Sequence, residues 1–125
     1  MVFDNLNDWL AHLETVHKTE IDLGLTRVGE MKTRLQQAGA LTLNYPIFTV
    51  GGTNGKGSTC AYLEQILLAA GYRVGCHTSP HVLDFTERAR FNGVDATSEQ
   101  LLPHFQTVES ARVQSPEMSL TYYEF

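Results

Sequence analysis

The residues with the clearest chemical potential form a glycine-rich run from Val50 to Cys60, VGGTNGKGSTC. An apolar stretch precedes this run and a strongly helical stretch follows it, so the order reads strand, glycine loop, helix. Glycine tolerates the positive φ angles that bring backbone N–H groups close to an anion, and the helix directs the positive end of its dipole to the same place. The run therefore predicts a phosphate cradle.

Lys56 supplies the mobile positive charge that such a loop uses on the β- and γ-phosphates of a nucleotide, so it is the predicted catalytic residue. In the general P-loop pattern a glycine and four further residues precede Gly-Lys-Ser/Thr, but Val50 stands in place of that glycine. Gly57 stands in place of the magnesium-binding hydroxyl, so the metal contact should come from elsewhere. Glycine-rich turns also occur without a ligand, yet this order of elements favours nucleotide binding. The residues expected to hold ATP are Gly52, Thr53, Asn54, Gly55, Lys56, Gly57 and Ser58.

These departures from the general pattern resemble a family pattern. The GTNGKGS run at 52–58 is similar to the P-loop of the Mur ligase superfamily, whose members use ATP to join an amino acid to a carboxylate. Segments 78–81 (TSPH) and 86–93 (TERARFNG) resemble those that follow the P-loop in folylpolyglutamate synthases. Segments 21–28 (IDLGLTRV) and 120–125 (LTYYEF) resemble the pterin-side segments of the bifunctional dihydrofolate synthase/folylpolyglutamate synthase family. The resemblance covers nearly the whole chain.

The resemblance implies a reaction and its ligands. ATP would phosphorylate a carboxylate of dihydropteroate or of a folate, and the amino group of L-glutamate would attack the acyl phosphate. Ser79 matches a serine that coordinates Mg²⁺ in the family, although on spacing alone it also fits a simple Ser-Pro turn. The partners would be these small molecules, with no nucleic acid and no membrane, and the parent enzyme would be a monomer.

The same resemblance implies a substrate site. Tyr122 and Tyr123 offer flat faces and hydroxyls to a pteridine ring, although tyrosines near a helix start also serve as core and rim residues. Without the resemblance, Asp22 and Arg27 would be plain surface charges. On the ribbon that follows the P-loop unit, Glu87, Arg88 and Arg90 are expected to be structural charges. The residues implied as pterin or folate contacts are Asp22, Leu23, Gly24, Leu25, Arg27, Thr121, Tyr122, Tyr123 and Glu124.

Composition limits the class of protein. The 125 residues are 42% hydrophobic, enough for a core, and contain neither a transmembrane run nor a signal peptide, which predicts a cytoplasmic protein. Nine basic residues against fourteen acidic ones argue against a nucleic-acid or anionic-membrane surface. The spacing of Cys60 and Cys76 fits neither a zinc site nor a redox pair, so two reduced thiols are expected. Cys76 and His77 are adjacent on a strand and face opposite sides, which disfavours a metal site.

Periodicity and breakers predict the elements in the first part of the chain. Helices are expected near 5–17 and from 28 to a glycine cap at 39. A strand at 47–50, a helix at 61–70 that ends at a glycine, and a strand at 73–77 would form a right-handed βαβ unit in a parallel sheet.

Further elements follow this unit. Residues 85–91 alternate and meet an Asn92-Gly93 hairpin turn, which predicts a β-ribbon. Residues 97–100 have capping-box form and open a helix that Pro103 should kink or restart. Residues 121–124 form a second capping box, where another helix would begin.

The predicted fold class is α/β: part of a P-loop-containing, Mur-ligase-like nucleotide-binding domain with a parallel sheet flanked by helices and a small β-ribbon. Residues 1–45 would be a helical substrate-side segment, and 46–125 the P-loop βαβ unit with the ribbon and helix. The resemblance implies that the rest of the ATPase domain and a C-terminal domain are absent, so the fragment alone should be inactive and prone to self-association. A Mur-type peptidoglycan precursor ligase, a P-loop kinase or GTPase, and a non-enzymatic nucleotide-binding fragment are the alternatives. The loop at 22–25 argues against the first of these.

Overall fold

The chain forms two compact units, which a computed structural model describes over residues 2–18 and 24–125. The first unit combines Met1–Asn44 with Ser98–Phe125, and the second is Tyr45–Thr97. The second unit is therefore inserted into the sequence of the first. The sequence predicts a simple division near residue 45, whereas the helix after residue 97 packs with the amino-terminal helices. None of the helices in the described part of the chain has the length and apolarity of a membrane span.

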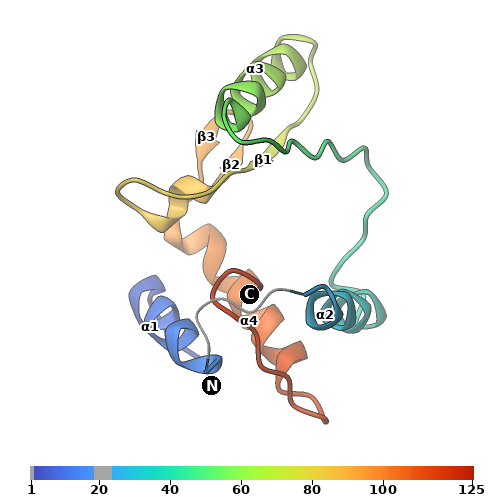
Figure 1. The fold of residues 1–125 in the computed structure, drawn as a ribbon, viewed down its shortest axis with the longest axis vertical. Coiled ribbons are helices and arrows are strands. Elements are labelled where there is room, and N and C mark those ends of the chain that lie inside the picture. Colours follow the sequence, from blue (N-terminus) through green and yellow to red (C-terminus); the bar gives the residue numbers. More distant parts are fainter. Residues whose placement is uncertain (1, 19–23) are drawn as a thin grey trace. The chain divides into compact units, whose positions relative to one another are not determined.

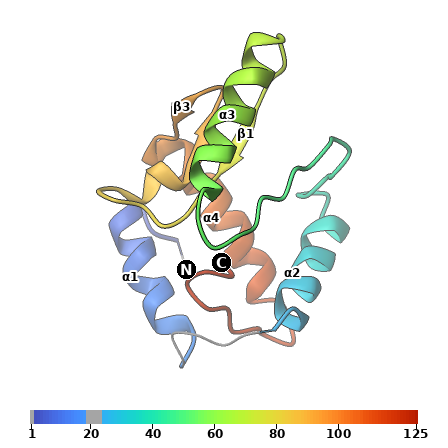
Figure 2. The same ribbon diagram turned by 45° about the horizontal axis from the view of Figure 1, so that its top comes forward.

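The first unit is built from three helices, α1 (Leu6–Val16), α2 (Thr26–Gln37) and α4 (Ser98–Arg112), and α4 lies between the other two (Figures 1 and 2). The helix predicted near 5–17 is confirmed by α1. It begins at Asn5, whose side-chain oxygen accepts the Asp8 N–H at 2.9 Å. Trp9 of α1 is fully buried, and its ring lies 5.8 Å from that of Phe105 on α4.

Two glycines end helices as the sequence predicts. Gly39 follows α2 with a φ of +71°, and the Ala40 N–H donates to the Leu35 carbonyl at 2.9 Å. Gly71 (φ +88°) repeats this arrangement after the helix of the second unit, where Tyr72 donates to the Leu67 carbonyl. A left-handed residue of this kind satisfies carbonyls that the helix itself leaves unpaired.

Helix α4 continues through Pro103 as one element, so the predicted restart does not occur. Proline removes one hydrogen bond from the helix. Leu101 and Phe105 are buried on either side of it, and their packing holds the helix together across the gap. Further along, Ala111 joins a core with three residues from other segments of the unit: Met31, Met118 and Leu120.

The second unit contains α3 (Lys56–Ala69), β1 (Gly75–His77), the short 3-10 helix η1 (Phe85–Arg88), β2 (Ala89–Phe91) and β3 (Val94–Asp95). The sheet is antiparallel with the order β1-β2-β3. The predicted hairpin turn is confirmed: Asn92 (φ 52°) and Gly93 (φ 83°) join β2 to β3. Asn92 also exchanges hydrogen bonds with Val74, which ties the turn to the start of β1.

The predicted parallel βαβ unit is wrong for the described residues. Residues 47–50 form no strand there, and β1 pairs with β2 in the antiparallel sense. Parallel strands need hydrogen-bonding neighbours and covered faces. Residues 47–50 have neither in the described chain, since Ile47 and Phe48 are 61% and 64% exposed. Strand-favouring residue types alone do not make a strand without a partner.

The continuous strand predicted at 85–91 is also wrong in its first half. Residues 85–88 form η1, because Asp84 and Glu87 make a reciprocal capping box at its start. The side chain of Asp84 accepts a backbone N–H of the turn, and that of Glu87 accepts the Asp84 N–H. The alternating residue pattern does not reveal this local competition between a turn and a strand.

Candidate functional site

The glycine loop lies at the start of α3, as the sequence predicts. Gly55 precedes the helix with a φ of +77°, and Gly52 has a φ of +149°. The Lys56 ammonium group donates to the Gly52 carbonyl, so the lysine reaches back across the loop. Residues 51–59 are all exposed. The structure therefore presents a lysine and the unpaired N–H groups of a first helical turn at one exposed helix end.

The loop backbone is open beside two of its glycines. A Cβ atom added to Gly55 or Gly57 would meet no atom within 4 Å, so internal packing does not require glycine at these positions. Glycine is what a phosphate oxygen needs for close approach to backbone N–H groups. The Thr59 hydroxyl donates to the Gly55 carbonyl at 2.8 Å, one turn back on the helix.

Ser79 follows the carboxyl end of β1 by two residues and is exposed. The peptide bond between Ser79 and Pro80 is cis. The preceding residue, Thr78, donates its N–H to the Arg88 carbonyl at 3.1 Å. Among the described residues, no group of three or more His, Cys, Asp or Glu side chains gathers as a metal site. The Ser79 side chain presents one exposed hydroxyl oxygen, and oxygen is the ligand type that Mg²⁺ takes.

Glu87 of η1 anchors the segment that follows Ser79. Its Oε1 atom accepts the N–H groups of Leu83 and Asp84, both at 2.7 Å, and its Oε2 atom accepts the Val82 N–H at 2.9 Å. These backbone donors hold the pKa of the Glu87 carboxyl below its usual value. The prediction of Glu87 as a structural charge agrees with these contacts, although the capping box that it forms with Asp84 was not predicted.

Arg90 ties the sheet to α3. Its Nε donates to Glu64 at 3.1 Å, and its other nitrogens donate to Asp95 and to the Gly93 carbonyl. Glu64 is only 4% exposed, so this pair fixes the P-loop helix against β2 and β3. The hydrogen bond that Arg90 donates to Glu64 raises the pKa of Arg90. The prediction of Arg90 as a structural charge agrees with these contacts.

The two cysteines are free, as the sequence predicts. Cys76 lies on β1 opposite Arg90, on the sheet face that meets α3. Burial raises the pKa of the Cys76 thiol, and the nearby Glu64 and Cys60 raise it further. Cys76 is therefore held as a neutral thiol and is a poor nucleophile.

In the first unit, the structure brings together two segments that the sequence assigns to a pterin. Arg27 donates from Nε to one oxygen of Glu124 at 3.0 Å and from a terminal nitrogen to the other at 2.8 Å. These residues are 97 positions apart in the chain. Asp22 and Leu23 belong to the same predicted site but lie outside the described residues.

Glu124 also closes the capping box that the sequence predicts. Its carboxylate accepts the Thr121 N–H at 2.9 Å, and its own N–H donates to the Thr121 hydroxyl at 3.2 Å. Burial alone would raise the pKa of Glu124, but Arg27 and the Thr121 N–H outweigh it and lower the pKa below its usual value. Arg27 and Glu124 thus form an ion pair with each other. Leu25 and Tyr123, by contrast, are 84% and 73% exposed.

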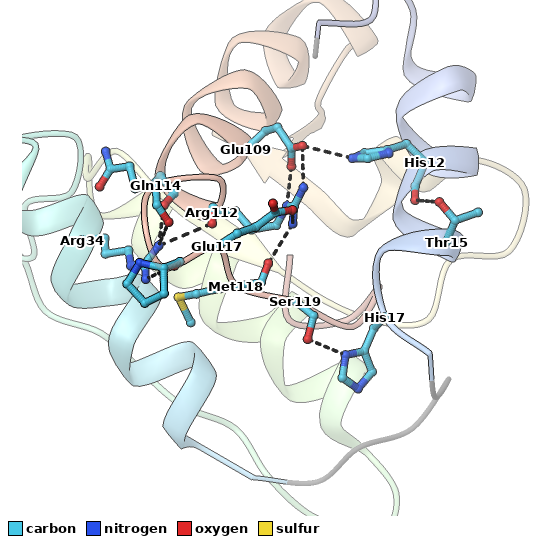
Figure 3. Close-up of polar contacts among 12 residues, drawn as sticks. His12, Thr15, His17, Arg34, Glu109, Arg112, Gln114, Glu117, Met118 and Ser119 are labelled. Atoms are coloured by element: carbon cyan, nitrogen blue, oxygen red, sulfur yellow. Dashed lines mark hydrogen bonds and ion pairs between the residues drawn. The ribbon is translucent and has the colours of Figure 1, made fainter.

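Figure 3 shows a charged cluster between α1 and α4 that the sequence analysis did not identify: Glu109, Arg112 and His12, joined by the exposed Glu117. Glu109 and Arg112 are 3% and 6% exposed and pair through two hydrogen bonds of 2.7 and 2.8 Å. His12 of α1 reaches Glu109 at 3.2 Å. Burial alone would raise the pKa of Glu109, but Arg112 and His12 lower it below its usual value. The spacing of Glu and Arg three apart was the available signal.

Arg34 of α2 binds backbone carbonyls at the end of α4 and in the segment that follows it (Figure 3). Its guanidinium donates to the carbonyls of Ala111, Gln114 and Pro116 at 2.7 to 3.1 Å. It also pairs with Glu30 on its own helix. Arg34 thereby satisfies carbonyls at the end of α4 that the helix leaves unpaired.

No family model matches the chain. Comparison with curated proteins finds dihydrofolate synthase/folylpolyglutamate synthases. The Escherichia coli (strain K12) protein is 47% identical over 120 residues, which is 96% of this chain and 27% of that protein. The Haemophilus influenzae protein is 42% identical over 123 residues, 96% of this chain and 26% of that protein. The chain thus spans about a quarter of the length of these relatives.

Solved structures give the same result. E. coli FolC in complex with DHPP and ADP matches with a TM-score of 0.86 at 46% identity, over 97% of this chain and 28% of that one. The Yersinia pestis bifunctional synthase complexed with AMPPNP and Mn ion matches with a TM-score of 0.84 at 45% identity, over the same shares. Over nearly all of its length, the chain is therefore similar to about a quarter of the length of dihydrofolate synthase/folylpolyglutamate synthases.

Proposed function

We propose that this chain is part of an ATP-dependent ligase that joins L-glutamate to dihydropteroate and to folates through an acyl phosphate. The observation that carries the proposal is the 47% identity with the E. coli synthase over 120 residues. The enzyme would act as a cytoplasmic monomer on small molecules. Such a reaction leaves the protein mainly to position reactants and to stabilise growing charge.

The second unit would bind the phosphates of ATP. Backbone N–H groups from Gly52 to Ser58 would hold the phosphates of ATP, and Lys56 would leave the Gly52 carbonyl to neutralise charge between the β- and γ-phosphates. The open space beside Gly55 and Gly57 supports this assignment. A charge-assisted hydrogen bond of this kind contributes about 1.5–3 kcal/mol.

Ser79 would ligate the magnesium ion. Mg²⁺ prefers oxygen ligands and keeps several waters, so one serine hydroxyl together with phosphate oxygens suits it. When bound, the ion would neutralise negative charge on the phosphates. The manganese ion named with AMPPNP in the Y. pestis relative supports a divalent cation at the nucleotide.

The first unit would bind the substrate that carries the carboxylate. Leu25 and Tyr123 offer exposed apolar surface for a pteridine ring, and Gly24, Thr121 and Tyr122 flank them. Asp22 and Leu23 complete the proposed site. Arg27 and Glu124 belong to it as well, and their ion pair joins the two segments that carry it.

A chimera tests the proposal. These 125 residues replace the matching segment of the E. coli synthase, and glutamate ligation to dihydropteroate is measured by ADP release. We expect ligation in the chimera and its loss in the Lys56→Ala chimera. Lys32→Ala, which removes an exposed lysine of α2, is the matched control and should keep full activity. A folded chimera that binds ADP without ligating glutamate would contradict the proposed function.

The same chimera separates the two substrates. Asp22→Ala should raise the KM for dihydropteroate and leave the KM for ATP nearly unchanged, because the loop is assigned to the pterin and not to the phosphates. Equal rises in both constants would show that the loop has only a structural role.

A further inference from the structure

The tip of the segment between β1 and η1 has no apolar support. Val82 and Leu83 are 86% and 83% exposed, so packing does not hold this part of the backbone. Three hydrogen bonds to the Glu87 carboxylate hold it instead. A carboxylate that accepts several backbone N–H groups is a strong local anchor, since each such bond is charge-assisted.

We propose that Glu87 is a positioning residue for Ser79: it fixes residues 82–84 and thereby the segment that presents the Ser79 hydroxyl to the divalent cation. The proposal rests on the assignment of Ser79 made above. Glu87 is not proposed as a ligand of the cation, because both of its carboxylate oxygens accept hydrogen bonds from backbone N–H groups of this segment.

The geometry leaves Ser79 little freedom once Glu87 is in place. On one side, Thr78 is fixed by its hydrogen bond to the Arg88 carbonyl. On the other side, Val82 is fixed by Glu87, so only residues 79–81 lie between two anchored points. His81 within this span accepts a hydrogen bond from the Arg88 Nε at 2.9 Å. A short span between fixed ends has few conformations.

Removal of the carboxylate should release this span. In Glu87→Gln the side-chain amide keeps one acceptor oxygen, but its NH₂ group faces backbone donors that it cannot satisfy. Glu14→Gln is the matched control, because it removes the same charge from an exposed position of α1. Glu87→Asp keeps the charge on a shorter side chain and should restore part of the anchoring.

The first readout is amide hydrogen exchange by NMR in the 125-residue chain, at a concentration below that at which it self-associates. Exchange at Val82, Leu83 and Asp84 should be about tenfold faster in Glu87→Gln than in the wild type or in Glu14→Gln. Unchanged exchange at these three amides would overturn the proposal, because the carboxylate would then not be what holds the segment.

The second readout is the affinity for Mn²⁺ in the presence of ADP, measured by water-proton relaxation. It should fall about tenfold in Glu87→Gln, as for other residues that orient a metal ligand. The affinity for ADP without metal should not change, which separates positioning from general loss of structure. Faster exchange with unchanged Mn²⁺ affinity would overturn the positioning role.

A third result would show that the assignment of Ser79 as a metal ligand is itself wrong. If the wild-type chain binds ADP through Lys56 but its affinity does not respond to Mn²⁺, the Ser79 assignment is wrong and the inference falls with it. The nucleotide-binding function would then stand without this ligand. If the chimera that contains this chain binds no ADP at all, the proposed function of the loop is itself contradicted.

Discussion

Arg27 and Glu124 form a bidentate ion pair in which the carboxylate is only 7% exposed. Such a pair is strong because both oxygens meet a fixed guanidinium fork, and the Thr121 N–H adds a third donor. Loss of either partner leaves a charge poorly solvated.

We expect Glu124→Ala to lower the free energy of unfolding of the chain by about 2 kcal/mol. Arg27→Ala should lower it by a similar amount, and the double variant by much less than the sum. Urea denaturation followed by Trp9 fluorescence measures all three, because Phe125 lies 6.2 Å from the Trp9 ring. Additive effects in this double-mutant cycle would show that the two side chains are not coupled.

At the scale of elements, the Glu109–Arg112 pair with His12 fastens α1 to α4. The pKa of Glu109 is lower in the folded chain than in the unfolded chain, so its charged form favours folding. This contribution is fully present above about pH 4.3, the value of an unfolded glutamate, and is lost as the pH falls through the folded pKa.

The expected result is a loss of stability in acid that depends on Glu109. Between pH 6 and pH 3 (about the range set by these pKa values), the free energy of unfolding should fall more in the wild type than in Glu109→Gln. Glu14→Gln, whose side chain is exposed, should follow the wild type. Parallel curves for the wild type and Glu109→Gln would contradict a depressed pKa.

The β2–β3 hairpin offers a second test at this scale. Gly93 has a φ of +83°, and a Cβ atom there would lie 3.2 Å from Leu68 of α3. Gly93→Ala should therefore cost about 1 kcal/mol or more of stability. Gly75→Ala on β1 is the control, because its φ is not positive and its Cβ would meet no atom within 4 Å. Equal melting temperatures for both variants would show that the turn tolerates a side chain.

The second unit exposes more large apolar side chains than the surface of a stable monomer normally carries. Those of Tyr45, Ile47, Phe48, Tyr62, Ile66 and Tyr72 are each 59% to 73% exposed. Exposed apolar surface and unpaired extended backbone favour association.

We expect the purified chain to self-associate as its concentration rises and to show no glutamate ligation by itself. Light scattering after size-exclusion chromatography measures the first, and ADP release with dihydropteroate and glutamate the second. Phe48→Lys should reduce association, whereas Val2→Lys, at an exposed apolar site of the first unit, should not. A stable monomer that ligates glutamate would contradict both expectations.

Local sequence signals predicted much of this fold. The glycine ends at Gly39 and Gly71 and the Asn92-Gly93 turn were predictable, because each depends on a backbone conformation that few residue types adopt. The strand at 47–50 was not, because a strand depends on a partner that its own residues do not encode. The turn at η1 was not predicted, because the alternating residue pattern there indicates a strand. The capping carboxylates of Asp84 and Glu87 stabilise a 3-10 turn instead.

For the candidate site, the loop at 52–58 was readable because glycine, lysine and a helix start suffice to define it. The pairing of Arg27 with Glu124 was not, since nothing local links residues 97 positions apart. The buried pair of Glu109 and Arg112 escaped for a related reason: its burial depends on α1, which supplies His12 from the other end of the chain.

The insertion of one unit into the other has a consequence for synthesis on the ribosome. The second unit is contiguous, so all of its residues have been made once Thr97 is joined. The first unit must wait, because α1 and α2 bury their apolar faces against α4, which is made after the second unit. Since domains fold as units while the chain emerges, the unit that contains the first helices completes its folding after the second unit. Until then Trp9 and Met31 remain uncovered, and a chaperone that recognises nascent chains would meet them there.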